Sequence, residues 1–337
     1  MFKNLHLLIF SILLLSLTVG CKRDNNENQT LTVSRLYVSS SDTDSTVSNL
    51  VVYDPADKNP YPSPYNFQNT RLPDAGGVFF DSKSGTVFQV GRTEKKIRVL
   101  LVGQYGDLTD KINFVDSTLK SPRALAYNKL KDSALLYISS DVDSSISVYT
   151  NPLNLSGVKV RASKKFKLNG KPWGIQSIGD SLMAVNSVLN KPEIHLYLKT
   201  SKLVSGLINP NNIITITGAT QLRGCIYIDS LDILIVTDIG IEGNQGDGKI
   251  YIIENTNSKF SSNAMVVPER TISGINTTLG DPIDVSYDRR KGKELIYIAD
   301  KLNKTILVFA LKDKENASPS IVQPLTSSPS AIYLDAR

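Results

Sequence analysis

The stretch "IYIADKLNKTILVF" at residues 296–309 decides the fold, because its pattern returns along the chain. "LYISSDVDSSISVY" at 136–149 aligns with it without a gap, and "LMAVNSVLNKPEIHLY" at 182–197 aligns with one or two added residues. Each copy consists of two apolar runs joined by a polar turn, and the runs are rich in Val, Ile, Leu and Tyr, which is typical of β-strands. The chain therefore repeats one β-unit.

A recurring proline marks the start of four of the six units, and we call this position the proline point. The same point is occupied in order by Ala75, Pro122, Pro172, Leu222, Pro282 and Pro329. The intervals between successive points are 47, 50, 50, 60 and 47 residues. Repeats of this length are typical of β-propellers and related arrays.

Each unit has enough short strands for one four-stranded blade. Two runs flank the turn described above, one precedes them at the proline, and less regular runs such as "NIITI" at 212–216 leave room for a fourth. The second strands lack polar alternation, which indicates burial on both faces between neighbouring blades. We predict an all-β, six-bladed propeller of four-stranded blades.

The two ends of the chain predict how the ring closes. "AIYLDAR" at 331–337 is a first strand with nothing behind it, whereas "RLYVSSSDTDSTVSNLVVYD" at 35–54 has a second and a third strand but no first. Pairing the C-terminal strand with the N-terminal strands would complete the sixth blade and remove two unpaired edges. A seventh blade is the alternative if the irregular stretch 55–75 contains strands.

Residues 1–20 are predicted to be a signal peptide, with basic Lys3 before an apolar run at 5–19. Thr18-Val19-Gly20-Cys21 resembles the lipobox of bacterial lipoproteins, which implies cleavage before Cys21 and its acylation; an ordinary secretory cut or an uncleaved anchor are the alternatives. Residues 21–31 are expected to be a flexible tether, and 32–337 a single propeller domain.

The Lys and acids after Cys21 resemble the surface-export signal of Bacteroidota lipoproteins. We therefore expect a lipid-anchored protein of the cell envelope, on the periplasmic or the surface side of the outer membrane.

The composition restricts the function. The net charge of +6 is spread over 337 residues without aromatic interleaving, and an exported protein does not meet intracellular nucleic acid, so nucleic acid is not an expected partner. His195 is the one histidine outside the signal peptide, which excludes a multi-His metal site within one chain. Cys225 lies in an apolar run and is expected to be a buried, unreactive thiol.

The fifth unit, "DPIDVSYDRRKGKELIYIADKLNKTILVF", resembles an NHL repeat. The matching residues are Pro282 at the first strand, Ala299 and Asp300 at the end of the second, Asn303 in the turn and Phe309 at the end of the third. Other units place Ser140, Ser187 and Asp238 where Asp300 stands, so the resemblance covers the wider family of six-bladed propellers. It implies a binding platform with ligands on a loop-lined face.

Two sets of loops are expected around one mouth of the central channel, those that enter first strands and those that join second to third strands. The first set carries Arg123, Trp173 and Arg223, which could hold an anionic or glycan-like ligand with Asp300 of the second set. The alternative interpretation is a Trp packed between blades and two Arg residues paired with acids.

A metal site is the second hypothesis. Asp238, Glu242 and Asp247 lie in the long insertion "TDIGIEGNQGDGK" and could surround a Ca²⁺ ion, although a hairpin tip needs no ion. Asn186 and Asp238 occupy equivalent places in successive units, as ligands do in lactonases of the gluconolactonase type, but the Glu of that site is not visible. We predict a non-catalytic binding or scaffolding module, which needs no cofactor and recognises an envelope protein, a glycan or a small anion; a metal-dependent lactonase is the alternative.

Overall fold

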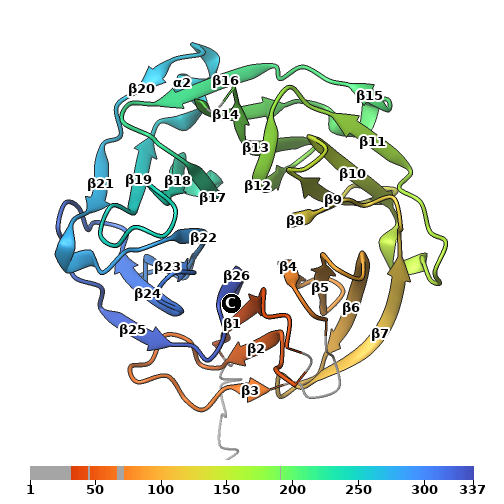
Figure 1. Cartoon of the computed structure of the whole chain (residues 1–337), viewed down its shortest axis with the longest axis horizontal. Helices are drawn as coiled ribbons and strands as arrows, with labels where there is room; N and C mark the ends of the chain where they lie inside the picture. Colours follow the sequence, from red (N-terminus) through yellow and green to blue (C-terminus); the bar gives the residue numbers. More distant parts are fainter. Residues whose placement is uncertain (1–31, 45, 67–71, 190) are drawn as a thin grey trace, which may run out of the picture. The chain divides into compact units, whose positions relative to one another are not determined.

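Six β-sheets of four or five strands stand around a central axis and form a closed ring (Figure 1). The structure is a computed structural model that describes residues 32–44, 46–66, 72–189 and 191–337. The ring is built by Val33–Arg337. The predicted six-bladed all-β propeller is therefore confirmed. Cys21, the predicted signal peptide and the whole of the predicted tether lie outside the described residues.

Within each blade, the strands are given in order from the one that lines the central channel to the outermost one. The first three blades contain β4 (Ala75–Asp81), β5 (Thr86–Gly91), β6 (Lys96–Val102) and β7 (Leu108–Val115); β8 (Pro122–Lys129), β9 (Ala134–Ser140), β10 (Ser145–Thr150), β11 (Lys164–Lys167) and an added β15 (Gly206–Leu207); and β12 (Lys171–Ile178), β13 (Ser181–Val188), β14 (Lys191–Tyr197), β16 (Asn212–Ile216) and an added β20 (Met265–Val266). The added strands pair in parallel with the outer strands.

The other three blades complete the ring. They contain β17 (Leu222–Ile228), β18 (Ile233–Asp238), β19 (Lys249–Glu254) and β21 (Arg270–Ser273); β22 (Pro282–Tyr287), β23 (Leu295–Asp300), β24 (Thr305–Ala310) and β25 (Ile321–Pro324); and β26 (Pro329–Ala336), β1 (Ser34–Ser40), β2 (Leu50–Tyr53) and β3 (Tyr65–Asn66). The short helices are α2 (Thr256–Ser261) and the 3₁₀ turns η2 (Pro152–Asn154), η3 (Thr200–Lys202), η4 (Asp229–Leu231) and η5 (Ile275–Thr277).

The last strand of the chain pairs with the first, as the sequence predicts. β26 runs antiparallel to β1, from the pair Ser34–Ala336 to the pair Ser40–Pro329. Val33 and Arg337 extend the ladder through two backbone hydrogen bonds of 2.7 and 3.0 Å. β3 lies within the irregular stretch and pairs with β2 as the outer strand of this sixth blade, so the seven-bladed alternative is wrong.

The hydrophobic core lies between the blades. In one cluster, Ile235 and Ile252 of the fourth blade pack against Ile296 and Phe309 of the fifth, and all four are buried. Five further clusters divide the rest of the interior. A central strand therefore has a neighbouring blade on each face, which explains the continuous apolar runs in the sequence.

Every channel-lining strand has an irregularity at the same place. The pairing register of β4, β8, β12, β17 and β22 shifts directly after the residue at the proline point, and the β26 register shifts between Pro329 and Ala331. Such bulges redirect side chains that regular pairing would point into the sheet. The residues just after the proline point therefore face the channel.

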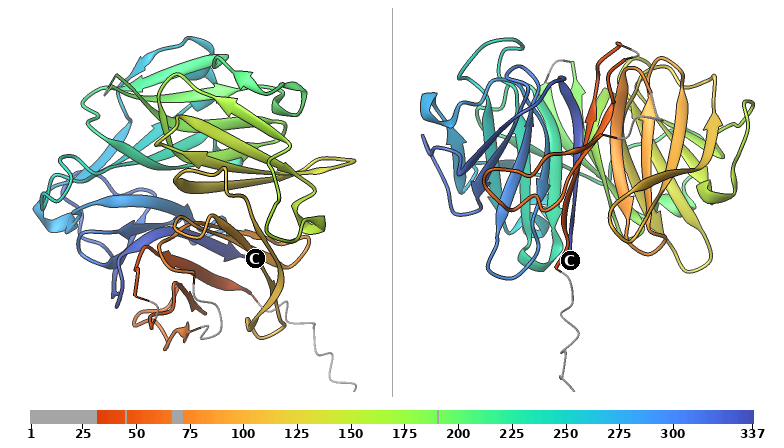
Figure 2. Two further views of the ribbon diagram at one scale, coloured as in Figure 1. Left: turned by 45° about the vertical axis from the view of Figure 1, so that its right-hand side comes forward. Right: turned by 90° about the horizontal axis from the view of Figure 1, so that it is seen from below.

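The ring has two faces. We call the upper face the one with the loops that enter first strands; the lower face carries Val33 and Arg337 at the ends of β1 and β26 (Figure 2). Within the part of the chain that the structure describes, no helix is long and apolar enough to cross a membrane. A cavity opens at each face, and we call these two cavities the upper mouth and the lower mouth.

Candidate functional site

The upper mouth is a cavity of about 240 Å³ at the start of the channel-lining strands. Its floor is formed by the six residues that directly follow the proline point. They are Gly76, Arg123, Trp173, Arg223, Ile283 and Ser330. Each lies within a strand irregularity, which is the local reason that these side chains face the channel.

Two arginines enclose the single tryptophan of the chain. The guanidinium carbon of Arg123 lies 4.6 Å from the Trp173 ring centroid, and that of Arg223 lies 3.8 Å from it. Both distances allow cation–π attraction, which keeps two like charges close together. The structure therefore brings Arg123, Trp173 and Arg223 into one cluster, which we call the Arg–Trp–Arg cluster.

The two arginines differ in how their charge is balanced. Arg123 donates two hydrogen bonds of 3.0 Å to the Asp141 carboxylate. Arg223 donates to neutral oxygens, the Gln221 side chain at 2.8 Å and the Leu222 carbonyl at 3.2 Å. Among the described residues, no carboxylate lies within ion-pair distance of Arg223. The positive charge of Arg223 is therefore not neutralised by an ion pair with any of these residues.

Burial makes this charge costly. Arg223 is only 8% exposed. Burial lowers its pKa to about 10; attraction from Glu242 partly offsets this effect, and repulsion from Arg123 adds to it. The guanidinium still carries its charge at neutral pH. A desolvated charge without a counterion is unfavourable, so an anion placed beside Arg223 would stabilise its guanidinium.

Further charges line the mouth, and the sequence analysis did not identify them. Arg92 is held by Asp74, and Lys301 lies 3.7 Å from the exposed Glu242. Both cations begin loops between second and third strands, where acidic residues are the more conspicuous candidates in the sequence. The signal that would have found them is a Lys or Arg directly after a second strand.

Exposed apolar side chains lie on the loops of the upper face. Val142, Leu189 and Ile241 lie on three loops that join second to third strands, and they are 68%, 91% and 65% exposed. Exposed apolar groups around a charged centre are a common feature of protein-binding surfaces. The upper face therefore combines the Arg–Trp–Arg cluster with exposed apolar side chains on its loops.

Asp300 does not line the upper mouth. Its buried carboxylate accepts hydrogen bonds from the backbone N–H groups of Gly280 at 2.7 Å and Asn303 at 3.0 Å. The Asn303 amide in turn donates to the Thr278 carbonyl at 2.9 Å. Burial raises the pKa of Asp300, although these hydrogen bonds work against it. The Asp and Asn of this unit thus fasten two loops together.

Asp238 and Asn186 hold loops in the same way. The Asp238 carboxylate accepts the N–H groups of Thr220, Gln221 and Gly240 at 2.6 to 2.9 Å. Asn186 is buried and donates to the Asn169 carbonyl at 3.0 Å. Each side chain makes its hydrogen bonds within its own blade, and Asn186 and Asp238 form no hydrogen bond with each other.

The 237–249 insertion is fastened through Asp247. Its Oδ2 accepts hydrogen bonds from the Ile241 backbone and the Asn244 side chain, each at 3.0 Å, and its Oδ1 is buried without a donor among the described residues. Glu242 points to the upper mouth beside Lys301. The described residues contain no group of three His, Cys, Asp or Glu side chains arranged to share a metal ion.

Calcium titration tests the metal hypothesis directly. After treatment with a chelator, calorimetric titration with CaCl₂ should give no saturable heat, because the loop carboxylates already accept N–H groups. Saturable heat that is lost in the Asp247→Asn variant would contradict this expectation. It would show that the insertion rearranges around an ion.

No protein family and no curated protein match the chain by sequence. Its fold is similar to solved structures. A chain of the "Crystal structure of Nidogen/Laminin Complex" is 14% identical with a TM-score of 0.60, and the match covers 90% of this chain and 98% of that one. A chain of "Kuenenia stuttgartiensis Hydrazine Synthase" is also 14% identical, with a TM-score of 0.53 and 88% of each chain covered. These similarities support the propeller fold.

Proposed function

We propose that the protein is a binding module whose upper mouth receives an anionic group of a partner. The observation that carries this proposal is the buried Arg223 charge, which lies against Trp173 and has no carboxylate partner among the described residues. A carboxylate entering the mouth would accept charge-assisted hydrogen bonds, and the arginine clamp would hold it in place.

The partner that fits this face best is a protein with an exposed acidic side chain. The three exposed apolar groups on the loops of the upper face could contact the protein surface around that acid, whereas a small free anion would leave them in water. The similar propeller solved within a nidogen/laminin complex supports protein binding by analogy of fold.

The anchoring of the module is part of the proposal. Acylation of Cys21 would attach the protein to the outer membrane of a cell envelope, with residues 21–31 as the tether. Val33, the first residue of the ring, lies at the lower face beside Arg337, on the side of the ring opposite the upper mouth. The fifth blade, with its Asp300 and Asn303 turn, is the part for which we propose kinship with NHL repeats.

Fluorescence of Trp173 tests the anion site, because the chain has a single tryptophan and it lies in the proposed site. A tetra-aspartate peptide should change the emission saturably, whereas a tetra-asparagine peptide should not. The Arg223→Met variant should bind the acidic peptide about tenfold more weakly or worse, since a charge-assisted hydrogen bond is lost.

The matched control is Arg289→Met, which removes an arginine from the lower mouth and should leave the titration unchanged. A response to the acidic peptide that is equal in both variants would overturn the proposed site. A response to a sulfated disaccharide without a response to the peptide would show that the anion belongs to a glycan and not to a protein.

A further inference from the structure

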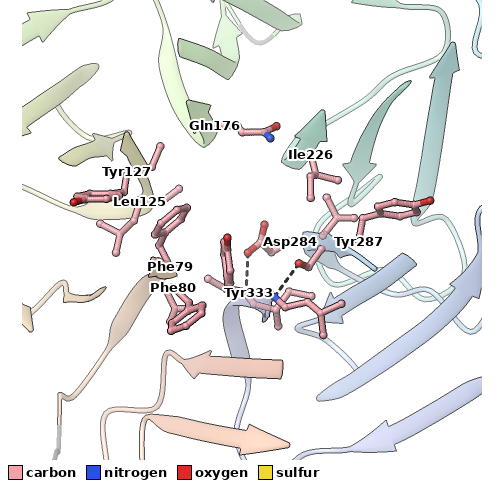
Figure 3. Close-up of a pocket in the computed structure, with 18 of the residues that line it drawn as sticks. Phe79, Phe80, Leu125, Tyr127, Gln176, Ile226, Asp284, Tyr287 and Tyr333 are labelled. Atoms are coloured by element: carbon pink, nitrogen blue, oxygen red, sulfur yellow. Dashed lines mark hydrogen bonds between the residues drawn. The ribbon is translucent and has the colours of Figure 1, made fainter. Parts of the chain in front are cut away.

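The lower mouth is a second, larger cavity of about 390 Å³ that is separate from the Arg–Trp–Arg cluster. Its walls come from the channel-lining strands of all six blades (Figure 3). A cavity of this volume is within the range of small-molecule sites in proteins. Its chemistry is different from that of the upper mouth.

Aromatic and aliphatic side chains form most of the wall. The Phe79 ring lies 4.7 Å from that of Tyr333 and 5.8 Å from that of Tyr127, as measured between centroids. Ile226 lines the cavity from β17 (Figure 3). These faces favour an apolar ligand body, and aromatic rings also attract cations.

A narrow waist separates the two mouths. It is formed by the second residue after the proline point in each blade. In chain order these residues are Gly77, Ala124, Gly174, Gly224, Asp284 and Ala331. Ala124, Gly174, Asp284 and Ala331 line both cavities.

Close strand packing requires small residues at the waist. A Cβ atom on Gly77 would lie 2.6 Å from the Leu125 nitrogen, and one on Gly224 would lie 2.6 Å from the Asp284 Cα. Five of the six positions accordingly hold Gly or Ala. A carboxylate at the sixth position is therefore an exception that packing does not require.

The Asp284 carboxylate lies where the lower mouth reaches the waist, and its charge is poorly compensated. Its Oδ2 accepts a hydrogen bond of 2.9 Å from the Ile332 backbone, and the Val285 N–H is its other donor. Within the described part of the chain, no side chain donates to it and no cation lies within ion-pair distance. Burial raises the pKa of this carboxyl to about 7, because the two amides do not offset the loss of hydration.

The other charged groups of the cavity stand at its far end. Arg289 follows β22 and donates to the Tyr227 carbonyl at 3.2 Å, and Arg337 is paired with Asp335 at 2.7 Å. On the side of β17, the buried Cys225 thiol borders Asp284, and proximity to this carboxylate adds to the burial that raises the Cys225 pKa to about 12. The inner end of the cavity is thus acidic, and its walls are aromatic.

We propose that the lower mouth binds a small organic amine, with its ammonium group at Asp284 and its apolar body between Phe79, Tyr127 and Tyr333. The ammonium would donate to the carboxylate oxygen that faces the cavity, and the aromatic walls would replace water around the ligand body. This site does not use the Arg–Trp–Arg cluster, although Asp284 borders both cavities.

Three ligands with one ring system test the charge requirement: tryptamine, which is cationic, 3-ethylindole, which is neutral, and indole-3-acetate, which is anionic. In calorimetric titrations of the full chain at pH 7, tryptamine should bind at least tenfold more tightly than 3-ethylindole, and indole-3-acetate should bind most weakly. The Asp284→Asn variant should abolish the preference for tryptamine. Glu315→Gln, which removes a carboxylate from an exposed side chain that does not line the cavity, should leave it unchanged.

Proton release provides a second measurement that needs no variant. If tryptamine holds Asp284 ionised, its binding at pH 7 should release about half a proton, measured as the dependence of binding heat on the ionisation enthalpy of the buffer. Absence of tryptamine binding, or binding with equal affinity in Asp284→Asn, would overturn the proposal. Tighter binding of indole-3-acetate would overturn it as well, and would assign the cavity to anions through Arg289.

Discussion

A chain that ends at Ser330, and therefore lacks residues 331–337, should unfold at a much lower temperature than the full chain. The truncation removes most of β26, which buries Ala331, Ile332 and Leu334 and pairs with β1 along its length. Loss of the two large side chains alone costs about 3–6 kcal/mol of unfolding free energy. That is a large part of the roughly 5–15 kcal/mol available to a typical domain.

The melting temperature of the truncated chain, followed by circular dichroism, should fall by about 10 °C or more. The matched control is Arg337→Ala, whose side chain is half exposed and pairs with Asp335 of the same strand. The control should melt close to the full chain. An unchanged melting temperature after truncation would mean that the ring does not depend on the ladder between its two ends.

Replacement of Asp284 by Asn should stabilise the ring at neutral and alkaline pH. The folded chain raises the pKa of this carboxyl from 3.8 to about 7, so ionisation is disfavoured in the folded state. Below pH 3.8 both states are protonated and no penalty exists. Between pH 3.8 and 7 the penalty grows, and above pH 7 it is complete, at up to about 4 kcal/mol. The Asn side chain is neutral throughout and keeps an oxygen for the Ile332 N–H.

Denaturant unfolding at pH 4, 6 and 8 measures this difference. The stability gained by Asp284→Asn should be small at pH 4 and largest at pH 8. Glu315→Gln removes the same charge from an exposed side chain and should show no such trend. A variant that is less stable than the parent at every pH would show that the ionised carboxylate supports the waist.

The two proposals and this prediction are connected by one physical argument. Arg223 at the upper mouth and Asp284 at the waist both carry a charge where water is scarce, and neither has an oppositely charged partner among the described residues. A charged side chain that lowers the stability of the fold is more readily retained at a position where it binds a ligand. The stability gained by removing Asp284 and the loss of tryptamine binding are therefore expected in the same variant.

The repeat in the sequence was sufficient to predict the architecture. The proline period, the apolar second strands and the incomplete units at both ends follow from the spacing of blades and from burial between them, and these are local properties of the chain. They predicted six blades and the pairing of β26 with β1 correctly. They also placed Arg123, Trp173 and Arg223 at equivalent points, from which their proximity in the ring follows.

Which polar residues face the cavities was decided by the tertiary structure. Asp238 and Asp300 look like ligands in the sequence, but their carboxylates are used by the N–H groups of loops that lie 17 to 20 residues away. Asp284 looks like an ordinary strand residue, because its isolation becomes visible only when six strands from the whole chain meet at the waist. A side chain's neighbours across the ring come from other repeats, so the sequence alone determined the ring, and only the closed ring determined which charges lack partners.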